Sequence, residues 1–235
     1  MTHPFARTEA LIGADALQRL ADSHVAVFGL GGVGGYAAEA LARCGVGALD
    51  LFDGDKVSLT NLNRQIVALH STLGRFKADV MRERVLDINP QCRVAVHRVY
   101  YVPENADQYD LGAYDYIVDA VDMVSAKVEL AVRAQAAGVP MVSAMGAGNR
   151  LNPGRLETAD IMDTAGCPLA RVMRRELKKR GVHTLRVVFS REPPIPMHCK
   201  DEGTQRRGVP VSVVFPPAAM GMALAAEAVC VLAGL

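Results

Sequence analysis

The feature that most constrains this fold is a glycine-rich loop between an apolar run and a helix of small residues. The run HVAVFG, residues 24–29, is typical of a buried parallel strand, and residues 31–45 predict a helix. Gly29, Gly31 and Gly34 give the pattern G-x-G-x-x-G at their junction. Such glycines let a phosphate approach the backbone and lie on the helix N-terminus. The loop therefore predicts a nucleotide site.

An acidic residue after the next strand strengthens this prediction. The segment ALDLFD predicts a second strand that ends in Asp53, nineteen residues beyond Gly34. A carboxylate at that position accepts hydrogen bonds from ribose hydroxyls. Gly32 adds a further residue without a side chain to the loop. Together these features indicate a nucleotide, without saying which one.

The remaining pattern alternates strands and helices, as in a parallel, doubly wound sheet. Before residue 150 we predict helices at 8–22, 74–90 and 126–138, and strands at 93–99, 114–122 and 139–146. After it we predict strands at 155–161, 184–190 and 209–215, a basic helix at 168–181, a loop at 191–208 and an apolar helix at 217–235.

The expected fold class is therefore α/β, with a Rossmann-like, doubly wound, mainly parallel sheet. Antiparallel strands extend this sheet in the C-terminal half. Residues 1–150 are expected to form the nucleotide-binding domain. Residues 151–235, with the basic helix, the antiparallel strands and the apolar helix, are expected to be an extension continuous with the same domain.

Polar residues follow Asp53 where a nicotinamide-binding domain usually enters a helix. Asn61, Arg64 and Gln65 come within twelve residues, and Lys77 follows later. Fixed positive charges suit a triphosphate and its leaving pyrophosphate, whereas a nicotinamide cofactor relies more on the glycine loop. The alternative is that Arg64 and Lys77 lie on solvated helix faces.

Two carboxylates end a central strand, where ligands of open parallel sheets gather. Asp122 is a candidate magnesium ligand, with phosphates and waters completing the coordination shell. For Asp119, a strand-end cap and a ligand role stay equally open.

Charge is unevenly distributed along the chain. Its net charge is +1, yet residues 171–207 hold eleven Lys or Arg and four Asp or Glu, a net charge of +7. This segment suggests an anionic partner on one face, and the alternative is a solvated helix and loop.

Neither a membrane span nor a disulfide framework is expected. The apolar run at 217–235 carries Glu227 near its middle and many small residues, which favours a buried helix. The N-terminus has no apolar signal-peptide core, and the five cysteines form no CxxC pair, so a cytoplasmic protein with free thiols is expected. Cys167 and Cys199 are interpreted as ordinary thiols and His198 as a solvent-facing loop residue.

The motifs GLGGVGG, DGDKVSLTNLNRQ, GRFKADV and DAVD resemble the ThiF/MoeB adenylating fold, which is related to ubiquitin-activating enzymes. In the second half, MGAGNRLNP, ADIMDTAGCPLARVMRRELKKRG and VVFS resemble the TcdA (CsdL) branch, the tRNA threonylcarbamoyladenosine dehydratases.

The resemblance implies an ATP- and Mg²⁺-dependent adenylating enzyme that releases AMP and pyrophosphate. It would activate the threonylcarbamoyl carboxylate on a tRNA adenosine, and cyclising dehydration would follow. By the same resemblance, Gly32 lies in the phosphate loop and Asp53 binds ribose. Asn61 and Arg64 contact the nucleotide, with Arg64 and Lys77 on the phosphates, and Asp122 binds magnesium.

The implied assembly is a homodimer in which Arg7 of one subunit reaches the other's ATP; a sulfur-relay protein is a further candidate partner. Two departures stand out. The paired CxxC zinc ligands of ThiF and MoeB are missing, so no such zinc site is expected. The loop at 191–208 also looks shorter than in many relatives.

Other functions compete with this one. The chain could adenylate the C-terminus of a ubiquitin-like sulfur carrier, although the missing zinc cysteines and the basic helix disfavour that. A nicotinamide-dependent oxidoreductase is disfavoured by Arg64, Lys77 and Asp122, and an inactive binding scaffold by the intact polar set.

Overall fold

The strands form one sheet that uses residues from both halves of the chain. The structure is a computed structural model and describes residues 3–196 and 211–235. The strand order is β3-β2-β1-β4-β5-β7-β6, and every pairing is parallel except the antiparallel pair β6 and β7. This confirms the predicted fold class. The strands are β1 (His24–Phe28), β2 (Ala48–Phe52), β3 (Arg93–His97), β4 (Tyr116–Asp119), β5 (Met141–Ala144), β6 (Leu156–Asp160) and β7 (Arg186–Ser190).

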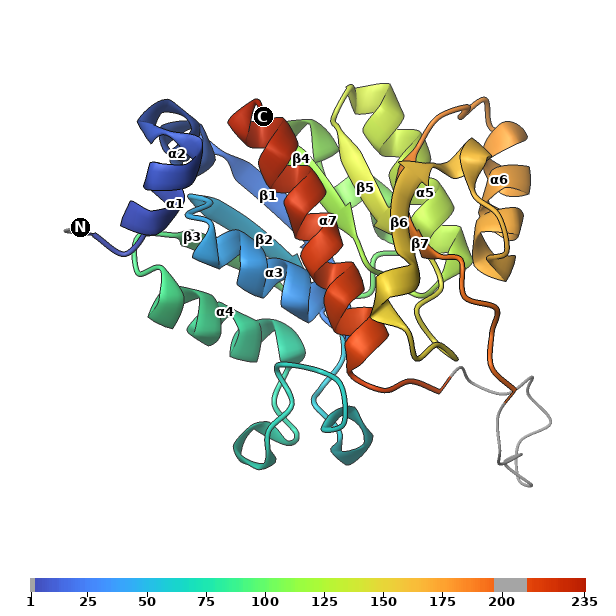
Figure 1. Ribbon diagram of the computed structural model, residues 1–235, viewed down its shortest axis with the longest axis horizontal. Helices are drawn as coiled ribbons and strands as arrows, with labels where there is room; N and C mark the ends of the chain where they lie inside the picture. The colour runs from blue at the N-terminus through green and yellow to red at the C-terminus, as the bar shows by residue number, and fades with distance from the viewer. Residues whose placement is uncertain (1–2, 197–210) are drawn as a thin grey trace.

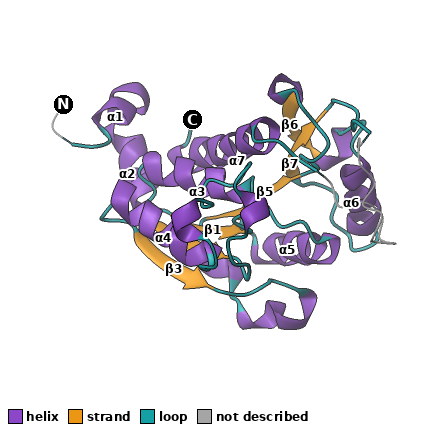
Figure 2. Cartoon of the chain, turned by 90° about the horizontal axis from the view of Figure 1, so that it is seen from below, coloured by secondary structure: helices purple, strands orange, loops and turns teal. Residues whose placement is uncertain are grey.

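Helices cover both faces of this sheet. In Figure 1, α3, α4 and α7 lie in front of the sheet, and Figure 2 shows α5 on the opposite side from α3 and α7. The helices are α1 (Ala6–Ile12), α2 (Ala14–Asp22), α3 (Gly34–Arg43), α4 (Lys77–Ile88), α5 (Val124–Ala137), α6 (Pro168–Lys178) and α7 (Phe215–Ala233). The 3₁₀ helices are η1 (Leu59–Asn61), η2 (His70–Thr72), η3 (Pro103–Gln108), η4 (Leu111–Ala113), η5 (Pro153–Arg155) and η6 (Ile161–Asp163).

The apolar β1 strand serves two cores at once. Val25 and Val27 pack into the cluster that contains residues of α3, α4 and α7, whereas Ala26 and Phe28 pack into the cluster under α5 and α6. Successive side chains of a strand point to opposite faces, so a strand buried on both sides is apolar throughout. This explains why HVAVF reads as a continuous apolar run.

Helix α7 is long and apolar enough to cross a membrane by composition, and 44% of its most apolar window is buried in this fold. It packs closely on the start of α3, because a Cβ added to Gly221 would lie 2.3 Å from the carbonyl oxygen of Val33. Glu227 forms an ion pair with Arg186 of β7 at 2.7 Å. These contacts fit the core helix of an α/β sheet.

Two predicted elements are wrong. Residues 211–214 of the predicted strand at 209–215 are not a strand, and residues 209–210 lie outside the described part of the chain. The Val211 amide donates to Asn149 Oδ1 and the Ser212 carbonyl accepts from Asn63 Nδ2, so side chains hold this segment. The predicted helix at 8–22 is divided into α1 and α2 at Gly13. The φ of Gly13 is 88°, whereas a right-handed helix requires a negative φ. The division at residue 150 stays a prediction.

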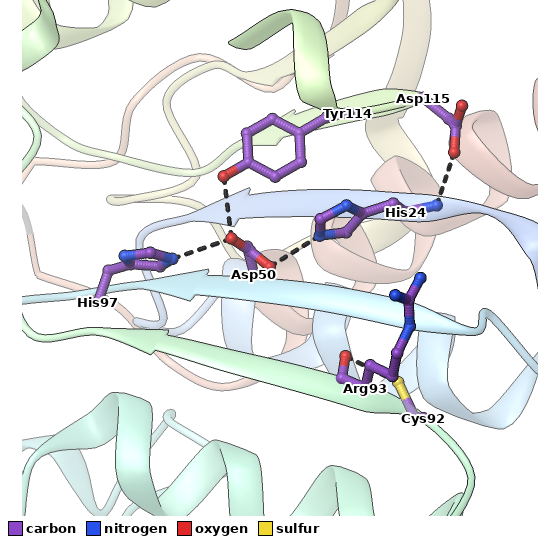
Figure 3. Close-up of polar contacts among 7 residues, drawn as sticks. All are labelled: His24, Asp50, Cys92, Arg93, His97, Tyr114 and Asp115. Atoms are coloured by element: carbon purple, nitrogen blue, oxygen red, sulfur yellow. Dashed lines mark hydrogen bonds and ion pairs between the residues drawn. The ribbon is translucent and has the colours of Figure 1, made fainter. Parts of the chain in front are cut away.

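A polar cluster crosses strands β1, β2 and β3. Figure 3 shows Asp50 of β2 between two histidines: His24 Nε2 lies 2.8 Å from Oδ1, and His97 Nε2 lies 2.9 Å from Oδ2. Tyr114 donates its hydroxyl to Oδ2 at 2.9 Å. Burial alone would raise the pKa of Asp50, but the hydrogen bonds from these three residues lower it below its usual value.

Candidate nucleotide-binding site

A cavity of about 420 Å³ opens at the carboxyl ends of β1, β2 and β4. Open parallel sheets bind ligands at this edge, next to the point where the strand order reverses. Its walls come from six parts of the chain: the glycine loop, the segment after β2, the residues after β3, those after β4, the turn after β5, and the start of α7 with the residues before it. The predicted site residues that line it are Gly29, Gly31, Gly32, Asp53, Asn61, Arg64, Lys77 and Asp122.

The glycines of the loop have different tasks. Gly29 adopts a φ of 86°, and a Cβ there would lie 2.7 Å from the carbonyl oxygen of Ala120. A Cβ on Gly31 or Gly32 would make only ordinary van der Waals contacts, the nearest of them at 3.4 Å from Pro217. Gly34 does not line the cavity, and its Cβ would lie 1.8 Å from the Gly29 carbonyl oxygen. Gly34 therefore allows α3 to pack on β1.

Asp53 is nearly buried and ties two loops together. Its Oδ2 accepts from the Leu30 amide at 2.7 Å and its Oδ1 accepts from the Asp55 amide at 2.8 Å. Burial raises the pKa of this carboxyl, although Lys77 and the two backbone amides oppose the shift. Because each carboxylate oxygen has a second lone pair, Asp53 retains acceptor capacity toward the cavity.

The predicted nucleotide contacts at Asn61 and Arg64 lie on the turn that begins with η1. Asn61 is buried, and its Oδ1 caps the turn by accepting from the Ser58 amide at 3.0 Å. The guanidinium of half-buried Arg64 donates to the Thr60 carbonyl and to Asn63 Oδ1, which are uncharged acceptors. Its positive charge is therefore available to an anion in the cavity.

Gln65, on the same turn, is a buried residue whose Oε1 has no hydrogen-bond partner within the described ranges. Its Nε2 lies 3.8 Å from where a Gly31 Cβ would be. A buried polar atom without a partner costs free energy, so its position behind the glycine loop fits a bound polar ligand.

Lys77 begins α4 and points its ammonium into the cavity wall. The side chain is only 6% exposed, and Nζ lies 2.7 Å from Asp55 Oδ2. Tyr100 donates its hydroxyl to the other oxygen of Asp55 at 2.5 Å. Lys77 is thus a buried cation, not the residue of a solvated helix face.

The two carboxylates at the end of β4, Asp119 and Asp122, differ in burial and in contacts. Asp119 is fully buried and forms an ion pair with fully buried Lys127 at 2.8 Å, while the Ser143 hydroxyl donates to the same oxygen. It is therefore a structural residue. Asp122 is exposed and lines the cavity, as a metal ligand shared with phosphates must be. No group of three metal-ligating side chains occurs in residues 3–196 and 211–235.

Three further residues lie away from this cavity. Arg7 is exposed on α1 and does not line it within one chain. Cys167 is buried at the N-cap of α6, with its Sγ 3.7 Å from a Gly146 Cβ position, and is also absent from the lining. Cys199 and His198 lie outside the described residues.

Sequence reasoning missed a set of cavity residues. Tyr100 and Tyr101 follow the end of β3, and that position at a strand's carboxyl end was the signal available for them. Phe28 and Phe52 form a stacked pair with centroids 4.2 Å apart. Ala147, Gly148, Ser212 and Pro217 also reach the cavity from the second half of the chain. Ala147 and Gly148 lie in the motif MGAGNRLNP, whereas no sequence signal pointed to Ser212 or Pro217.

The basic helix α6 presents an exposed cationic surface, but one of its arginines is not part of it. Arg174 is half-buried and donates to the carbonyls of Ile161 and Thr164, so it anchors the helix. Arg174 therefore does not belong to the surface for an anionic partner that the charge of residues 171–207 suggests. Glu176 partly neutralises three neighbours, and hydrogen bonds from Lys179, Arg180 and Arg175 lower its pKa to about 2. The exposed cations are Arg171, Arg175, Lys178, Lys179 and Arg180.

A model of the ThiF family matches residues 5–235. A tRNA threonylcarbamoyladenosine dehydratase from Bacillus subtilis is 44% identical over 196 residues, which cover 83% of this chain and 77% of that protein. The Escherichia coli enzyme of the same name is 45% identical over 174 residues, 74% of this chain and 65% of that one.

Solved structures give the same relationship over nearly the whole chain. The E. coli dehydratase TcdA in complex with ATP is 36% identical, with a TM-score of 0.87 over 98% of this chain and 93% of that one. The same enzyme was also solved with AMP. An E. coli molybdopterin-synthase adenylyltransferase matches less, being 38% identical over 55% of this chain and 51% of that protein.

Proposed function

The chain belongs to the ThiF family, and from this premise we propose that it is an ATP-dependent tRNA threonylcarbamoyladenosine dehydratase. The observation that carries this proposal is the cavity itself. It is lined by the glycine loop and by Asp53, which is suited to ribose. Two cations, Arg64 and Lys77, suit the phosphates, and the carboxylate of Asp122 suits a magnesium ion bound to them. The similarity to a TcdA structure that contains ATP, which covers 98% of this chain, supports the proposal.

The proposed reaction has two steps. The threonylcarbamoyl carboxylate attacks the α-phosphorus of ATP, an O–P bond forms, and pyrophosphate leaves. An internal N–H nitrogen then attacks the activated acyl carbon and loses its proton to solvent, the C–O bond to AMP breaks, and the ring closes. AMP carries away the oxygen that the substrate loses, so ATP drives a net dehydration. No enzyme side chain has to act as a nucleophile, and positioning supplies most of the catalysis.

The chain's own groups serve these steps by charge and position. Asp53 is proposed to accept hydrogen bonds from the ribose, and Asn61 to contact the nucleotide. Arg64 and Lys77 are proposed to stabilise the charge that develops on the phosphates. Binding in the cavity would limit the contact of the acyl-adenylate with water, in which it is prone to hydrolysis.

Magnesium fits the donor set but is proposed, not observed. Asp122 supplies an exposed carboxylate oxygen in the cavity, and Mg²⁺ commonly binds one or two carboxylates together with substrate phosphates. When bound, the ion would draw charge from the phosphates.

A homodimer is proposed from the outward face of α7. Phe215, Met222, Ala226 and Cys230 are exposed at spacings of seven, four and four residues, which place them on one helix face. An apolar stripe of this kind suits an isologous interface with a second copy. Arg7 would then approach the partner subunit's nucleotide. We also propose a cytoplasmic location, and leave a sulfur-relay protein as a further candidate partner.

The second candidate is adenylation of a ubiquitin-like sulfur carrier. It is weaker, because the adenylyltransferase match covers only 55% of the chain.

One assay tests the proposal against its competitors. Pyrophosphate and AMP release from ATP is measured with unmodified tRNA, with threonylcarbamoylated tRNA and with a sulfur-carrier protein. We expect stimulation by the threonylcarbamoylated tRNA alone. Stimulation by the carrier protein instead would establish the second candidate, and no response to modified tRNA would contradict the first.

A further inference from the structure

Asp55 lies between Lys77 and Tyr100 and accepts a hydrogen bond from each, and it has no role in the reaction proposed above. Its Oδ2 accepts from Lys77 Nζ at 2.7 Å, and its Oδ1 accepts from the Tyr100 hydroxyl at 2.5 Å. All three residues line the cavity. Each oxygen of one carboxylate therefore holds a different side chain of the site.

Backbone contacts fix Asp55 independently of its side chain. Its amide donates to Asp53 Oδ1 at 2.8 Å, and its carbonyl accepts from the Lys77 amide at 3.0 Å. Lys77 is thus bound to Asp55 twice, through its backbone and through its ammonium. The hydrogen bond of the Asp55 amide also connects this pair to Asp53, the carboxylate proposed to bind ribose.

Tyr100 is held just as firmly, although its side chain is largely exposed. Its ring packs on the backbone of Gly54, where an added Cβ would lie 2.9 Å from two ring carbons. Its carbonyl accepts from Asn105 Nδ2 at 2.9 Å. Any side chain at residue 54 would displace the ring, so the glycine in DGD permits the contact between Tyr100 and Asp55.

We propose that Asp55 is a positioning residue that holds the Lys77 ammonium in place for the phosphates of ATP, and that Tyr100 holds Asp55 in the orientation required. This inference rests on the proposed function. A lysine is a point charge on a flexible four-carbon stem, so restricting it before the ligand binds lowers the entropy cost of binding.

The protonation states suit this role. Burial acts to raise the pKa of Asp55, but hydrogen bonds from Lys77 and Tyr100 lower it overall, so the carboxylate stays ionised. The hydrogen bond to Asp55 is the main cause that raises the pKa of Tyr100 to about 12, so its hydroxyl stays a donor.

Equilibrium binding without tRNA tests the proposal. Isothermal titration calorimetry measures the affinities of the full-length protein for ATP and for adenosine, which lacks phosphates. We expect Asp55→Asn to weaken ATP binding about tenfold, as for a lost hydrogen bond to a charged group, and to leave adenosine binding unchanged. Tyr100→Phe should change ATP affinity in the same direction by a smaller factor, and adenosine affinity not at all.

A double-mutant cycle separates positioning from direct contact. In a Lys77→Met background, Asp55→Asn should cause no further loss of ATP affinity, because Asp55 acts through Lys77. A full additional loss in that background would overturn the proposal. So would tighter ATP binding by Asp55→Asn, which would mean that the carboxylate competes with phosphate, or a loss of adenosine affinity in Tyr100→Phe.

Matched control variants lie outside the cavity. Tyr114→Phe removes a hydroxyl that also donates to an aspartate, Asp50, and Asp107→Asn breaks an exposed ion pair with Arg133. Both should leave ATP affinity unchanged. Failure of the proposed function is separately visible: wild-type protein would then bind ATP but release no pyrophosphate with threonylcarbamoylated tRNA, while the Asp55 results would stand unaltered.

Discussion

Substitution by alanine should affect ATP binding at one glycine of the motif and the stability of the fold at another. Gly31→Ala is expected to fold with near wild-type stability, because its Cβ would meet nothing closer than 3.8 Å, yet the methyl group would protrude into the cavity and weaken ATP binding. Gly34→Ala should lose at least about 2 kcal/mol of stability, since its Cβ would overlap the Gly29 carbonyl.

Urea unfolding and ATP titration of both variants measure these effects. The assignment of Gly31 to the phosphate loop is wrong if its alanine variant binds ATP as the wild type does.

The two aspartates after β4 offer a second contrast between binding and folding. Asp122→Asn should fold normally and raise the magnesium concentration for half-maximal activity about tenfold or more, because even outer-shell partners of metal ligands cost that much. Asp119→Asn should destabilise the fold by about 3–5 kcal/mol, since it leaves Lys127 charged and buried without its partner.

Activity at varied magnesium and thermal unfolding separate the two. An unchanged magnesium requirement in Asp122→Asn would remove this residue from the metal site.

At the scale of elements, the Asp50 cluster makes the β1–β3 part of the sheet sensitive to acid (Figure 3). The pKa of Asp50 is lower in the folded chain than its usual value of 3.8. Its carboxylate therefore stabilises the fold above about pH 4, and this contribution is lost as the pH falls through the lower, folded value. Asp50→Asn should have a lower free energy of unfolding at pH 7 than the wild type, and this free energy should fall less steeply as the pH is lowered.

Urea unfolding between pH 7 and pH 3 gives both curves. Parallel acid limbs for the wild type and Asp50→Asn would show that this carboxylate does not contribute.

Helix α6 should act as a surface for the phosphate backbone of tRNA. The double variant Arg171→Glu/Lys178→Glu removes two exposed cations, and we expect weaker tRNA binding with a log–log salt slope smaller by roughly 1 to 2. Arg82→Glu, an exposed substitution on α4, is the matched control. Filter binding at several salt concentrations measures the slope, and an unchanged slope in the α6 variant would exclude this helix.

The elements that the sequence predicted well are those with local signals. The strand HVAVF lies in its predicted place, and the glycine loop and the acid at residue 53 line the cavity, because a buried parallel strand and a tight glycine turn each need particular residues. The strand at 209–215 is wrong because Asn149 and Asn63, distant in sequence, bind residues 211 and 212. The prediction of a strand rested on the β propensity of the valines, and this local property does not depend on contacts with distant residues.

The same distinction applies to the site. Arg64 and Lys77 could be found from their types and spacing, whereas Ser212 and Pro217 reach the cavity only because α7 crosses back over α3. Tyr100 was visible as a residue after a strand, but its contact with Asp55 depends on the absence of a side chain at Gly54. Long-range packing therefore decides the parts of the site that the sequence did not reveal.

At the scale of the whole molecule, the place of Arg7 poses a problem that only an assembly can solve. Helix α3 begins with Gly34, directly after the cavity-lining Val33. Gly45, beyond the other end of the helix, lies against Phe5, next to α1. Ten helical residues separate these ends by about 15 Å. Arg7 therefore lies far along the sheet from its own cavity, and a role at a nucleotide requires the cavity of a partner subunit.

A purified heterodimer tests this directly. One subunit carries Arg7→Ala and the other Lys77→Met, and separate affinity tags isolate the mixed species. If Arg7 serves the partner's site, the Arg7→Ala subunit keeps its own Lys77 and receives an intact arginine, so about half of the wild-type activity returns by the symmetry of the dimer. An inactive heterodimer, with both homodimers inactive, would place Arg7 in its own chain's reaction, and a fully active Arg7→Ala homodimer would exclude it from the site.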